Sequence, residues 1–353
     1  MSRPLSPTRR LTVRLLALVS ATLLILTGAI SASAHGNSSS SLKGLKILLT
    51  NDDSMQAARP NNSDGLGLYE IRRSLCAAGA DVVVIAPWQV QSGRGTAVTN
   101  SGTFWLGTKT LPAAYANDCA GAPAKGQVYG LCLDTAPCSA TSASATPSDT
   151  VKFASRGGLK ALAGWDEPDL VVSGSNSGNN LANSVTDSGT VGATVAAIED
   201  EIPAVAFSSS GTADFSTFPL ANYRATAEWG AKFIAGLRSA RLLSQHDFAL
   251  NVNYPNVAEG ATAKKAVWAS VGDQTYAHHG YVPQADGSYK VALSACSGLP
   301  DCEETKRDAD VTWIQRGHIT VVPINWDRTY GERTDSRILA KVRSFVEHKA
   351  PRP

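Results

Sequence analysis

The segment KILLTNDD, residues 46–53, decides the fold that we expect for this chain. It starts as an apolar run of strand length and ends in two adjacent carboxylates, Asp52 and Asp53. A continuous apolar run is typical of a parallel strand buried on both faces, and ligands of such sheets bind beyond the carboxyl ends of the strands. The segment therefore predicts an α/β fold, with both aspartates at the edge of the sheet where a ligand binds.

Apolar runs and amphipathic helices alternate along the rest of the chain. A helix is expected from Leu66 to Gly79, and residues 81–87, DVVVIAP, form a second apolar run. Strand, helix and strand at this spacing are typical of a right-handed βαβ unit. Residues 174–183, GSNSGNNLAN, predict a loop because they are rich in glycine and asparagine. Further strands are expected at 169–173, 204–208 and 248–254, and further helices at 147–162, 191–198 and around 229–237.

We expect three regions in the chain. Residues 1–34 form a leader, and residues 35–245 form the α/β core with an elaborated, cysteine-containing insertion near 111–146. From residue 246 to 353 the patterns are short and β-like, up to a strand at 319–323, and a closing helix is expected from about residue 335. The predicted fold class is thus a mostly parallel α/β core followed by a β-rich C-terminal extension.

The leader has the composition of a secretory signal peptide. Four arginines precede an apolar segment at residues 15–30, and the small residues Ala32-Ser33-Ala34 follow it. This order predicts export and cleavage after Ala34. An uncleaved membrane anchor is the alternative, but the apolar segment is shorter than the ~20 residues that a spanning helix needs. The pair Arg9-Arg10 leaves both the Sec and the twin-arginine export routes open.

The charge balance argues against some classes of partner. The chain has 32 basic and 30 acidic residues and a formal net charge of +2, and its Lys and Arg residues form no stripe. A protein that binds a nucleic-acid polymer usually has such a basic footprint. We therefore expect a small molecule as the ligand, and no membrane association beyond export.

All six cysteines follow the leader, which suits an oxidising compartment. Cys296 and Cys302 flank a short loop and are expected to pair. Two of the three cysteines in the insertion are expected to pair with each other, with Cys76 as the candidate partner of the third; these three are Cys119, Cys132 and Cys138. A zinc site is the rival interpretation, but no CxxC motif or nearby histidine accompanies these cysteines.

Asp52 and Asp53 are the first candidates for chemistry. Carboxylate oxygens suit Mg²⁺, Mn²⁺ or Ca²⁺, and two adjacent ionised carboxylates need a cation to offset their repulsion. Taken alone, the pair is also typical of a turn or helix cap. Two other strand-end loops carry neutral oxygen ligands, Ser92 and Asn176, which would converge on the same crevice. The four residues together predict a site for one divalent cation.

A second candidate is Ser188-Gly189-Thr190, at the expected start of a helix. The free backbone N–H groups, the two hydroxyls and the positive end of the helix together form an anion site. An ordinary N-cap by Ser188 is the alternative. A cation beside an anion-binding helix start is what phosphoryl transfer requires.

Other enzyme classes fit the sequence less well. No GxSxG motif surrounds Ser92 or Ser173 and no histidine has an obvious triad placement, which disfavours a serine hydrolase. His278-His279 lies in a glycine-bounded loop that we expect to be solvated. A glycosidase is disfavoured because adjacent carboxylates at one strand end do not flank a bond from opposite sides.

At this point the sequence resembles a known family, the survival protein E (SurE) phosphatases and nucleotidases. Several motifs in the same order carry the resemblance over most of the mature chain. They are ILLTNDD (47–53), DVVVIAP with QSG (81–87 and 91–93), TPSD (146–149), PDLVVSGSNSGNN (168–180), SGTVGA (188–193), IPAVAFS (202–208), LNVNYP (250–255) and DADVTWIQRGHITVVPINWD (308–327).

The resemblance implies a Rossmann-like, three-layer core, one divalent cation per subunit, and hydrolysis of nucleoside monophosphates or other small phosphate esters. It implies metal ligation by Asp52, Asp53, Ser92 and Asn176, with catalytic roles for Asp52, Asp53 and Asn176. Phosphate binding is expected from Asn51, Ser188, Gly189 and Thr190. A homodimer or homotetramer is also implied, with the C-terminal segment as its oligomerisation arm.

This chain departs from the family pattern in three places. An insertion from Ser54 to Gly65 follows the aspartates, where the family usually has a short loop. The insertion at 111–146 has no counterpart in compact members, and members are commonly cytosolic. We therefore predict an exported, metal-dependent phosphomonoesterase whose natural substrate stays open. An exported nucleotide or phosphate binding protein without turnover is the alternative.

Overall fold

The computed structural model describes residues 41–244 and 246–327, together with residues 341 and 344. All of these belong to one compact unit, which begins at residue 40. The expected signal peptide, and the expected closing helix apart from two of its residues, lie outside the described residues. Within the described part of the chain, no helix is both long enough and apolar enough to span a bilayer.

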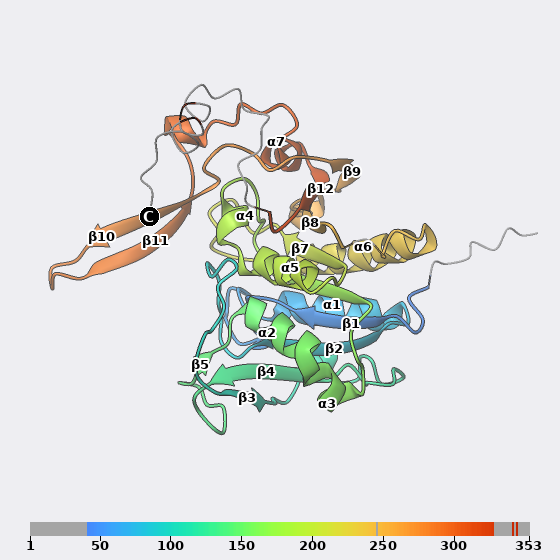
Figure 1. The fold of residues 1–353 in the computed structure, drawn as a ribbon. Helices are drawn as coiled ribbons and strands as arrows, with labels where there is room; N and C mark the ends of the chain where they lie inside the picture. Colours follow the sequence, from blue (N-terminus) through green and yellow to red (C-terminus); the bar gives the residue numbers. More distant parts are fainter. Residues whose placement is uncertain (1–40, 245, 328–340, 342–343, 345–353) are drawn as a thin grey trace, which may run out of the picture. The chain divides into compact units, whose positions relative to one another are not determined.

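A mixed sheet of ten strands runs through the described residues (Figure 1). Its centre is parallel, in the order β4-β2-β1-β6-β7-β8. These strands are β1 (Lys46–Thr50), β2 (Asp81–Pro87), β4 (Val128–Leu133), β6 (Leu170–Ser177), β7 (Ala204–Ser209) and β8 (Ala249–Tyr254). The edges carry β3 (Phe104–Gly107) and β5 (Ala143–Ser144), both antiparallel to β4, then β12 (His318–Ile324), antiparallel to β8, and β9 (Lys264–Trp268), parallel to β12.

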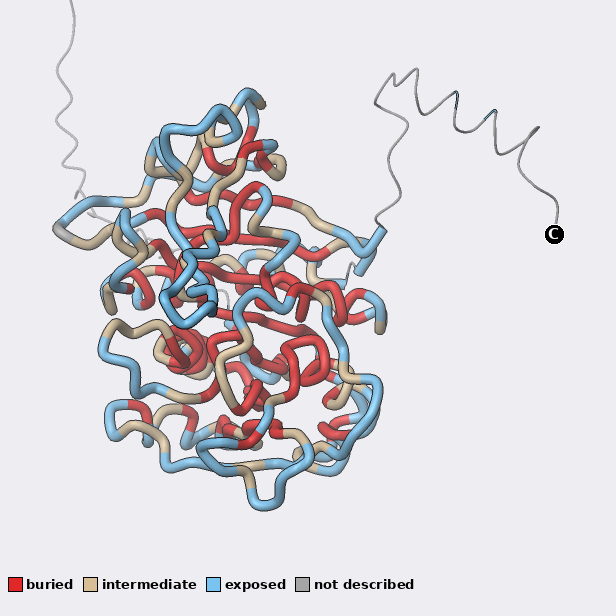
Figure 2. The backbone as a smooth tube through the Cα atoms, turned by 90° about the vertical axis from the view of Figure 1, so that its left-hand side faces the viewer, coloured by how far each residue is buried: buried red, intermediate tan, exposed pale blue. Residues whose placement is uncertain are grey.

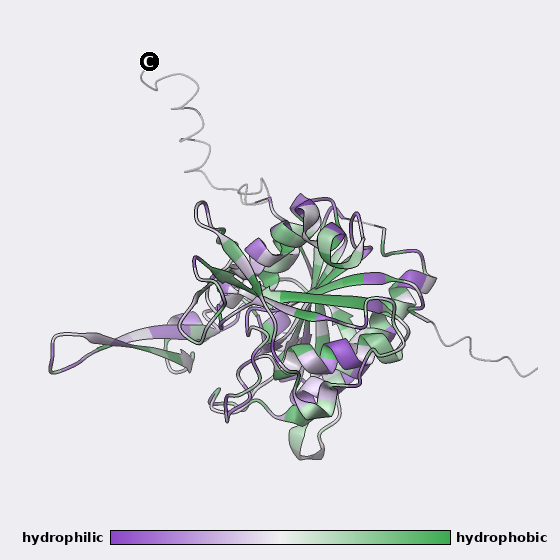
Figure 3. Ribbon diagram, turned by 90° about the horizontal axis from the view of Figure 1, so that it is seen from below, coloured by the Kyte–Doolittle hydropathy of each residue, from purple (hydrophilic) through white to green (hydrophobic). Residues whose placement is uncertain are grey.

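Helices cover both faces of this sheet (Figure 3). Alternate residues of each central strand belong to opposite hydrophobic layers. Leu49 and Val84 pack toward α1 (Leu66–Ala77) and α6 (Leu220–Ser239). Leu48 and Val83 pack toward the other layer, formed by α2 (Pro147–Phe153), α3 (Leu159–Ala163) and α5 (Gly189–Glu199). The central strands are buried along nearly their whole length (Figure 2). Burial on both faces explains why these strands are apolar without alternation.

The remaining elements are short or lie outside the sheet. Helices α4 (Ser184–Asp187) and α7 (Asp310–Gln315) precede α5 and β12. A π turn (Ala154–Gly158) separates α2 from α3, and 3₁₀ turns lie at Ala113–Tyr115, Ala258–Gly260 and Pro300–Cys302. A separate antiparallel hairpin, β10 (Ala277–Pro283) and β11 (Tyr289–Ala295), extends away from the sheet (Figure 1).

The strand order reverses between β1 and β6. From β1 the chain adds β2 and β4 on one side, and from β6 it adds β7 and β8 on the other. In open α/β sheets a ligand-binding crevice forms outside the carboxyl ends of the strands at such a switch point. The loops that follow β1 and β6 therefore border this crevice.

The predicted three-layer α/β fold with a mostly parallel sheet is confirmed. The loop prediction for residues 174–183 was wrong for its first four residues, because β6 continues to Ser177 through a bulge. The helix expected at 147–162 is interrupted by the π turn, and α4 and α7 were not predicted. Among the described strands of the segment that begins at residue 246, β8, β9 and β12 join the main sheet, and the β10–β11 hairpin stands apart.

All six cysteines form disulfides, in the predicted combination. The pairs are Cys76–Cys119, Cys132–Cys138 and Cys296–Cys302. The zinc alternative is wrong in this structure, because no free thiol remains to bind the metal.

Arg72 also holds the insertion: its buried guanidinium donates hydrogen bonds to the carbonyls of Tyr115, Asp118 and Gly126 at 2.7 to 3.1 Å.

Candidate functional site

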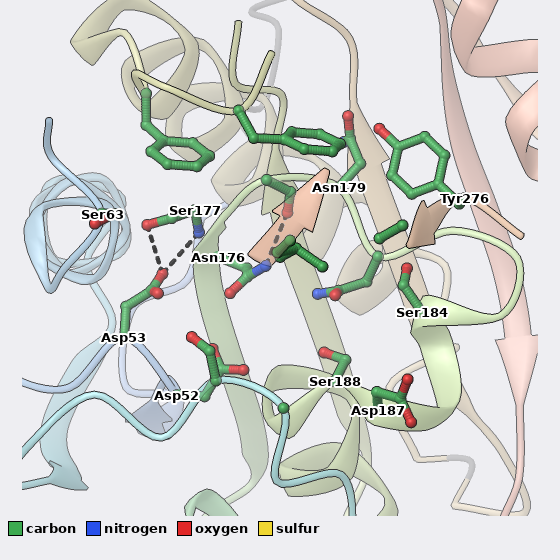
Figure 4. Close-up of a pocket in the computed structure, with 18 of the residues that line it drawn as sticks. Asp52, Asp53, Ser63, Asn176, Ser177, Asn179, Ser184, Asp187, Ser188 and Tyr276 are labelled. Carbon is green, nitrogen blue, oxygen red and sulfur yellow. Dashed lines mark hydrogen bonds between the residues drawn. The ribbon is translucent and has the colours of Figure 1, made fainter. Parts of the chain in front are cut away.

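A cavity of about 240 Å³ lies at the switch point of the sheet. It is bordered by the loops after β1, β2 and β6, by α4 and the start of α5, by the loop between β7 and α6, and by the base of the β10–β11 hairpin. Five of the predicted site residues line it: Asp52, Asp53, Ser92, Asn176 and Ser188. Figure 4 shows Asp52 and Asp53 side by side, facing Asn176.

Asp53 is fixed through one of its two carboxylate oxygens. Its Oδ2 accepts hydrogen bonds from the backbone N–H of Ser177 at 2.7 Å, the Ser177 hydroxyl at 2.8 Å and the Asn51 amide at 3.1 Å (Figure 4). No hydrogen bond from the described residues reaches Oδ1. The bonds to Oδ2 therefore fix the orientation of the carboxylate, and Oδ1 is left for a ligand.

Asp52 is held by the start of α5. The Thr190 hydroxyl donates to its Oδ1 at 2.6 Å, and the Thr190 N–H donates to its Oδ2 at 3.1 Å. The fit is close, because a Cβ added at Gly189 would lie 2.8 Å from the Cβ of Asp52. The Asp52 carbonyl accepts from the Gln91 N–H at 2.7 Å, which joins this loop to the one that carries Ser92. The first turn of α5 therefore positions the carboxylate.

The two carboxyl groups are buried beside each other, and this changes their acidity. Burial raises the pKa of Asp52, although the hydrogen bonds from Thr190 oppose the rise. Burial, together with the neighbouring charge of Asp52, raises the pKa of Asp53 well above its usual range. Two buried like charges favour a bound cation, which stabilises both ionised forms. The donor set, made of carboxylate, amide and hydroxyl oxygens, fits a hard divalent ion.

Asn176 is placed by the bulge in β6. Between Ser173 and Asn176 the pairing with β7 gains one residue, and such a bulge redirects the side chains that follow it. Gly174 permits this path: its φ is +129°, and a Cβ there would lie 2.2 Å from the Phe207 carbonyl oxygen. The Asn176 amide donates to the Gly178 carbonyl at 2.8 Å, so its Oδ1 is available to the cavity (Figure 4).

Ser92 and Ser188 border the cavity from two further loops. Ser92 is exposed, and no hydrogen bond within the described residues engages its hydroxyl. The Ser188 hydroxyl accepts from the Val191 N–H at 3.1 Å, which is the N-cap considered as the alternative. Ser188 also lines the cavity, so it is both a cap and a surface of the site.

Three predicted phosphate-binding residues are not among those that line the cavity. Asn51, Gly189 and Thr190 lie behind the aspartates. Thr190 donates its hydroxyl to Asn51 at 3.1 Å as well as to Asp52, and Asn51 contacts Asp53. In this structure they position the carboxylates, and their contact with phosphate stays a prediction.

Sequence reasoning missed several residues of the cavity. Ser177, Asn179 and Asn180 were inside a quoted motif, and the polarity of that motif was the signal that could have singled them out. Asp187, immediately before Ser188, is an exposed third carboxylate at the cavity. Arg59, Ser63, Phe215, Phe218 and Tyr276 come from loops without a periodic pattern, and His279 lies in β10. His279 was expected to be solvated, and it is exposed where it lines the cavity.

Comparisons with known proteins give relatives along most of the chain. The 5'-nucleotidase SurE of Solidesulfovibrio magneticus is 29% identical over 283 residues, covering 80% of this chain and 92% of the relative. The 5'-nucleotidase SurE of Christiangramia forsetii is 29% identical over 294 residues, with the same two coverages. The crystal structure of the SurE protein from Aquifex aeolicus has a similar fold, with a TM-score of 0.54 and 23% identity over 85% of this chain and 99% of that one.

The family comparison covers the site itself. The model of the family described as "Survival protein SurE" matches residues 47–278. This range begins within β1 and includes all the loops that carry the predicted ligands. The chain therefore belongs to the SurE family.

Proposed function

We propose that this protein is an exported phosphomonoesterase that depends on a divalent cation and hydrolyses nucleoside monophosphates or other small phosphate esters. The observation that carries the proposal is the convergence of Asp52, Asp53, Ser92 and Asn176 on one cavity at the switch point. Relatives that align with most of the chain are named 5'-nucleotidase. Release of phosphate from a nucleotide is therefore the reaction that the site fits best.

The proposed metal ligands are Asp52, Asp53, Ser92 and Asn176. A divalent cation held there supplies charge neutralisation and Lewis acidity at a phosphoryl oxygen. Ser177 and Asn51 keep Asp53 in one orientation, and Thr190 does the same for Asp52. The preorganised carboxylates do not need to rearrange during the reaction, which lowers its barrier. Asp52 is also our candidate for the group that accepts a proton from the attacking water.

Export and assembly are part of the proposal. The arginine-rich leader with its Ala-Ser-Ala end and the three disulfides both support a location outside the cytoplasm. For the C-terminal segment we propose a role in a homodimer or homotetramer.

The proposal predicts that Asp52→Asn abolishes turnover without unfolding the protein. Loss of a ligand and candidate base is expected to lower kcat for AMP and p-nitrophenyl phosphate by at least about 100-fold. The measurement is phosphate release in Mn²⁺, with circular dichroism as the check on folding. Asp166→Asn is the matched control, because that carboxylate is 88% exposed and pairs only with Lys160 in the described structure.

Two outcomes contradict the proposal. Full activity of Asp52→Asn would remove Asp52 from the mechanism. Saturable binding of AMP by the unmodified protein in Mn²⁺, with no phosphate released from any ester, would favour the binding protein without turnover.

A further inference from the structure

We propose that the cavity binds a planar aromatic group of the substrate against Phe215, so that the enzyme selects phosphate monoesters of nucleosides and aryl alcohols over those of glycerol or sugars. This inference rests on the proposed function and identifies the class of leaving group. It also assigns a specificity-determining role to a loop that sequence motifs do not mark.

The cavity has two chemically different sides. Asp52, Asp53 and Ser188 form a polar side where a phosphate would lie. Phe215, Phe218 and Tyr276 line the same cavity, and Figure 4 shows Tyr276 across the site from Asp53. Cavities that bind small molecules commonly combine an apolar or aromatic wall with a few polar groups. A phosphate at the carboxylate side leaves the rest of its ester next to the aromatic side.

Phe215 is held in an unusual backbone conformation. Its φ is +58°, a left-handed value that is disfavoured for a bulky side chain. The surrounding turn imposes this conformation: the Phe215 N–H donates to the Thr212 carbonyl at 2.9 Å, and the Thr212 N–H donates to the Thr217 carbonyl at 2.9 Å. Asp214 closes the turn by accepting from the Thr212 hydroxyl at 2.7 Å. Such overdetermined strain concentrates at ligand-binding positions.

The aromatic side is anchored before any ligand binds. The ring of Phe215 meets that of Tyr276 edge to face, with centroids 5.9 Å apart. Phe218 is buried, and its N–H donates to the Asn61 carbonyl at 3.1 Å. The Tyr276 N–H donates to the Asn183 side chain at 2.7 Å. Two segments thus supply the three rings, and the contact between Phe215 and Tyr276 restricts the Phe215 ring, which reduces the side-chain entropy lost on stacking.

The neighbouring amide groups are engaged inside the protein. The Asn179 amide donates to the Tyr254 carbonyl at 3.2 Å, and that of Asn180 donates to the Ser208 hydroxyl at 2.9 Å. One N–H of each amide is therefore used inside the protein. Stacking against Phe215 tolerates any aromatic ring system, so it would favour aromatic esters as a class.

The test compares two substrate classes in Phe215 variants of the full mature protein. Unmodified enzyme is expected to have a kcat/KM for AMP at least about 10-fold above that for glycerol 3-phosphate. Loss of a stacking ring typically weakens an interaction by about 10- to 100-fold, so Phe215→Ala should lower kcat/KM for AMP by that factor and leave glycerol 3-phosphate within about threefold. Phe215→Tyr should restore the preference. Trp268→Ala, which removes a 64% exposed ring outside the cavity, is the control.

Two additional measurements keep the result interpretable. Phe215→Asn removes the ring but tolerates the left-handed backbone, so it tests stacking if the alanine variant unfolds. The affinity for adenosine, which has no phosphate, should fall in Phe215→Ala and in Phe215→Asn, whether or not the protein turns over substrate. Calorimetry measures this affinity. An unchanged substrate ratio and unchanged adenosine affinity would overturn the inference. Absence of phosphate release from every ester would instead contradict the proposed function.

Discussion

At the scale of the residue, Gly189 determines the geometry of the site. It has no side chain, so helix α5 can approach Asp52 closely. An added Cβ would lie 2.8 Å from the Asp52 Cβ and 3.0 Å from the Pro147 Cγ. Both neighbours are held in place, Asp52 by Thr190 and Pro147 by the first turn of α2. The crowding can therefore be relieved only by moving α5, which would lengthen the hydrogen bonds that orient Asp52.

We expect Gly189→Ala to lower kcat/KM for AMP by about 10- to 100-fold, since displacements of about 1 Å can have effects of that size. The matched control is Gly236→Ala in α6, where an added Cβ meets no atom within 4 Å. That control should raise the free energy of unfolding by about 1 kcal/mol and leave activity unchanged, because alanine is the better helix former. Equal activity of the two variants would show that the close approach has no catalytic consequence.

Asp310 is a second residue with a measurable signature, this time in pH dependence. It is fully buried and accepts hydrogen bonds from the N–H groups of Val311 at 2.8 Å and Gly272 at 3.0 Å. Burial nevertheless raises its pKa from 3.8 to about 6. Between these two values the folded protein holds a proton that the unfolded chain has released, so stability falls as the pH rises.

The contribution of Asp310 to the free energy of unfolding should therefore be largest below pH 3.8 and about 3 kcal/mol smaller above pH 6. Asp310→Asn cannot titrate and should lose this part of the pH dependence. Urea unfolding of both proteins at several pH values across this window measures the difference. Parallel stability curves for the two proteins would contradict the assigned pKa.

At the scale of the element, strands were predictable where burial alone sets the composition. The run at residues 81–87 is apolar because both faces are covered, and it forms β2 over those same residues. Asp52, Asp53, Ser92 and Asn176 could be grouped for a related reason: the carboxyl ends of parallel strands share one edge. No knowledge of side-chain contacts was needed for either inference.

Elements that carry site residues were less predictable, because their polar residues are buried and form hydrogen bonds inside the protein. Residues 174–177 contain glycine, serine and asparagine, which are typical of a turn, yet they extend β6. Their polar groups find partners inside the protein: Ser175 bonds Ser209 at 2.5 Å, and Ser177 bonds Asp53. Composition does not separate a solvated turn from a strand satisfied by internal hydrogen bonds. The Phe215 turn has no periodicity at all, and only its backbone angle reveals it.

At the scale of the whole molecule, the three disulfides constrain segments of different length. Cys76–Cys119 joins α1 to the insertion and spans 43 residues of sequence, whereas Cys132–Cys138 and Cys296–Cys302 each span 6. Closing a longer loop restricts the unfolded chain more strongly. Under proposed export, the protein would form these bonds in an oxidising compartment.

We expect the long-range disulfide to contribute most to stability. The loop-entropy relation gives about 4 kcal/mol for the 43-residue separation and about 2 kcal/mol for a 6-residue one. The double variant Cys76→Ala/Cys119→Ala should therefore lose about twice as much unfolding free energy as Cys296→Ala/Cys302→Ala, measured by urea denaturation. The catalytic loops contain none of these cysteines, so both variants should keep kcat for AMP while folded. Equal losses in the two variants would mean that native packing around each bond, rather than loop length, sets its contribution.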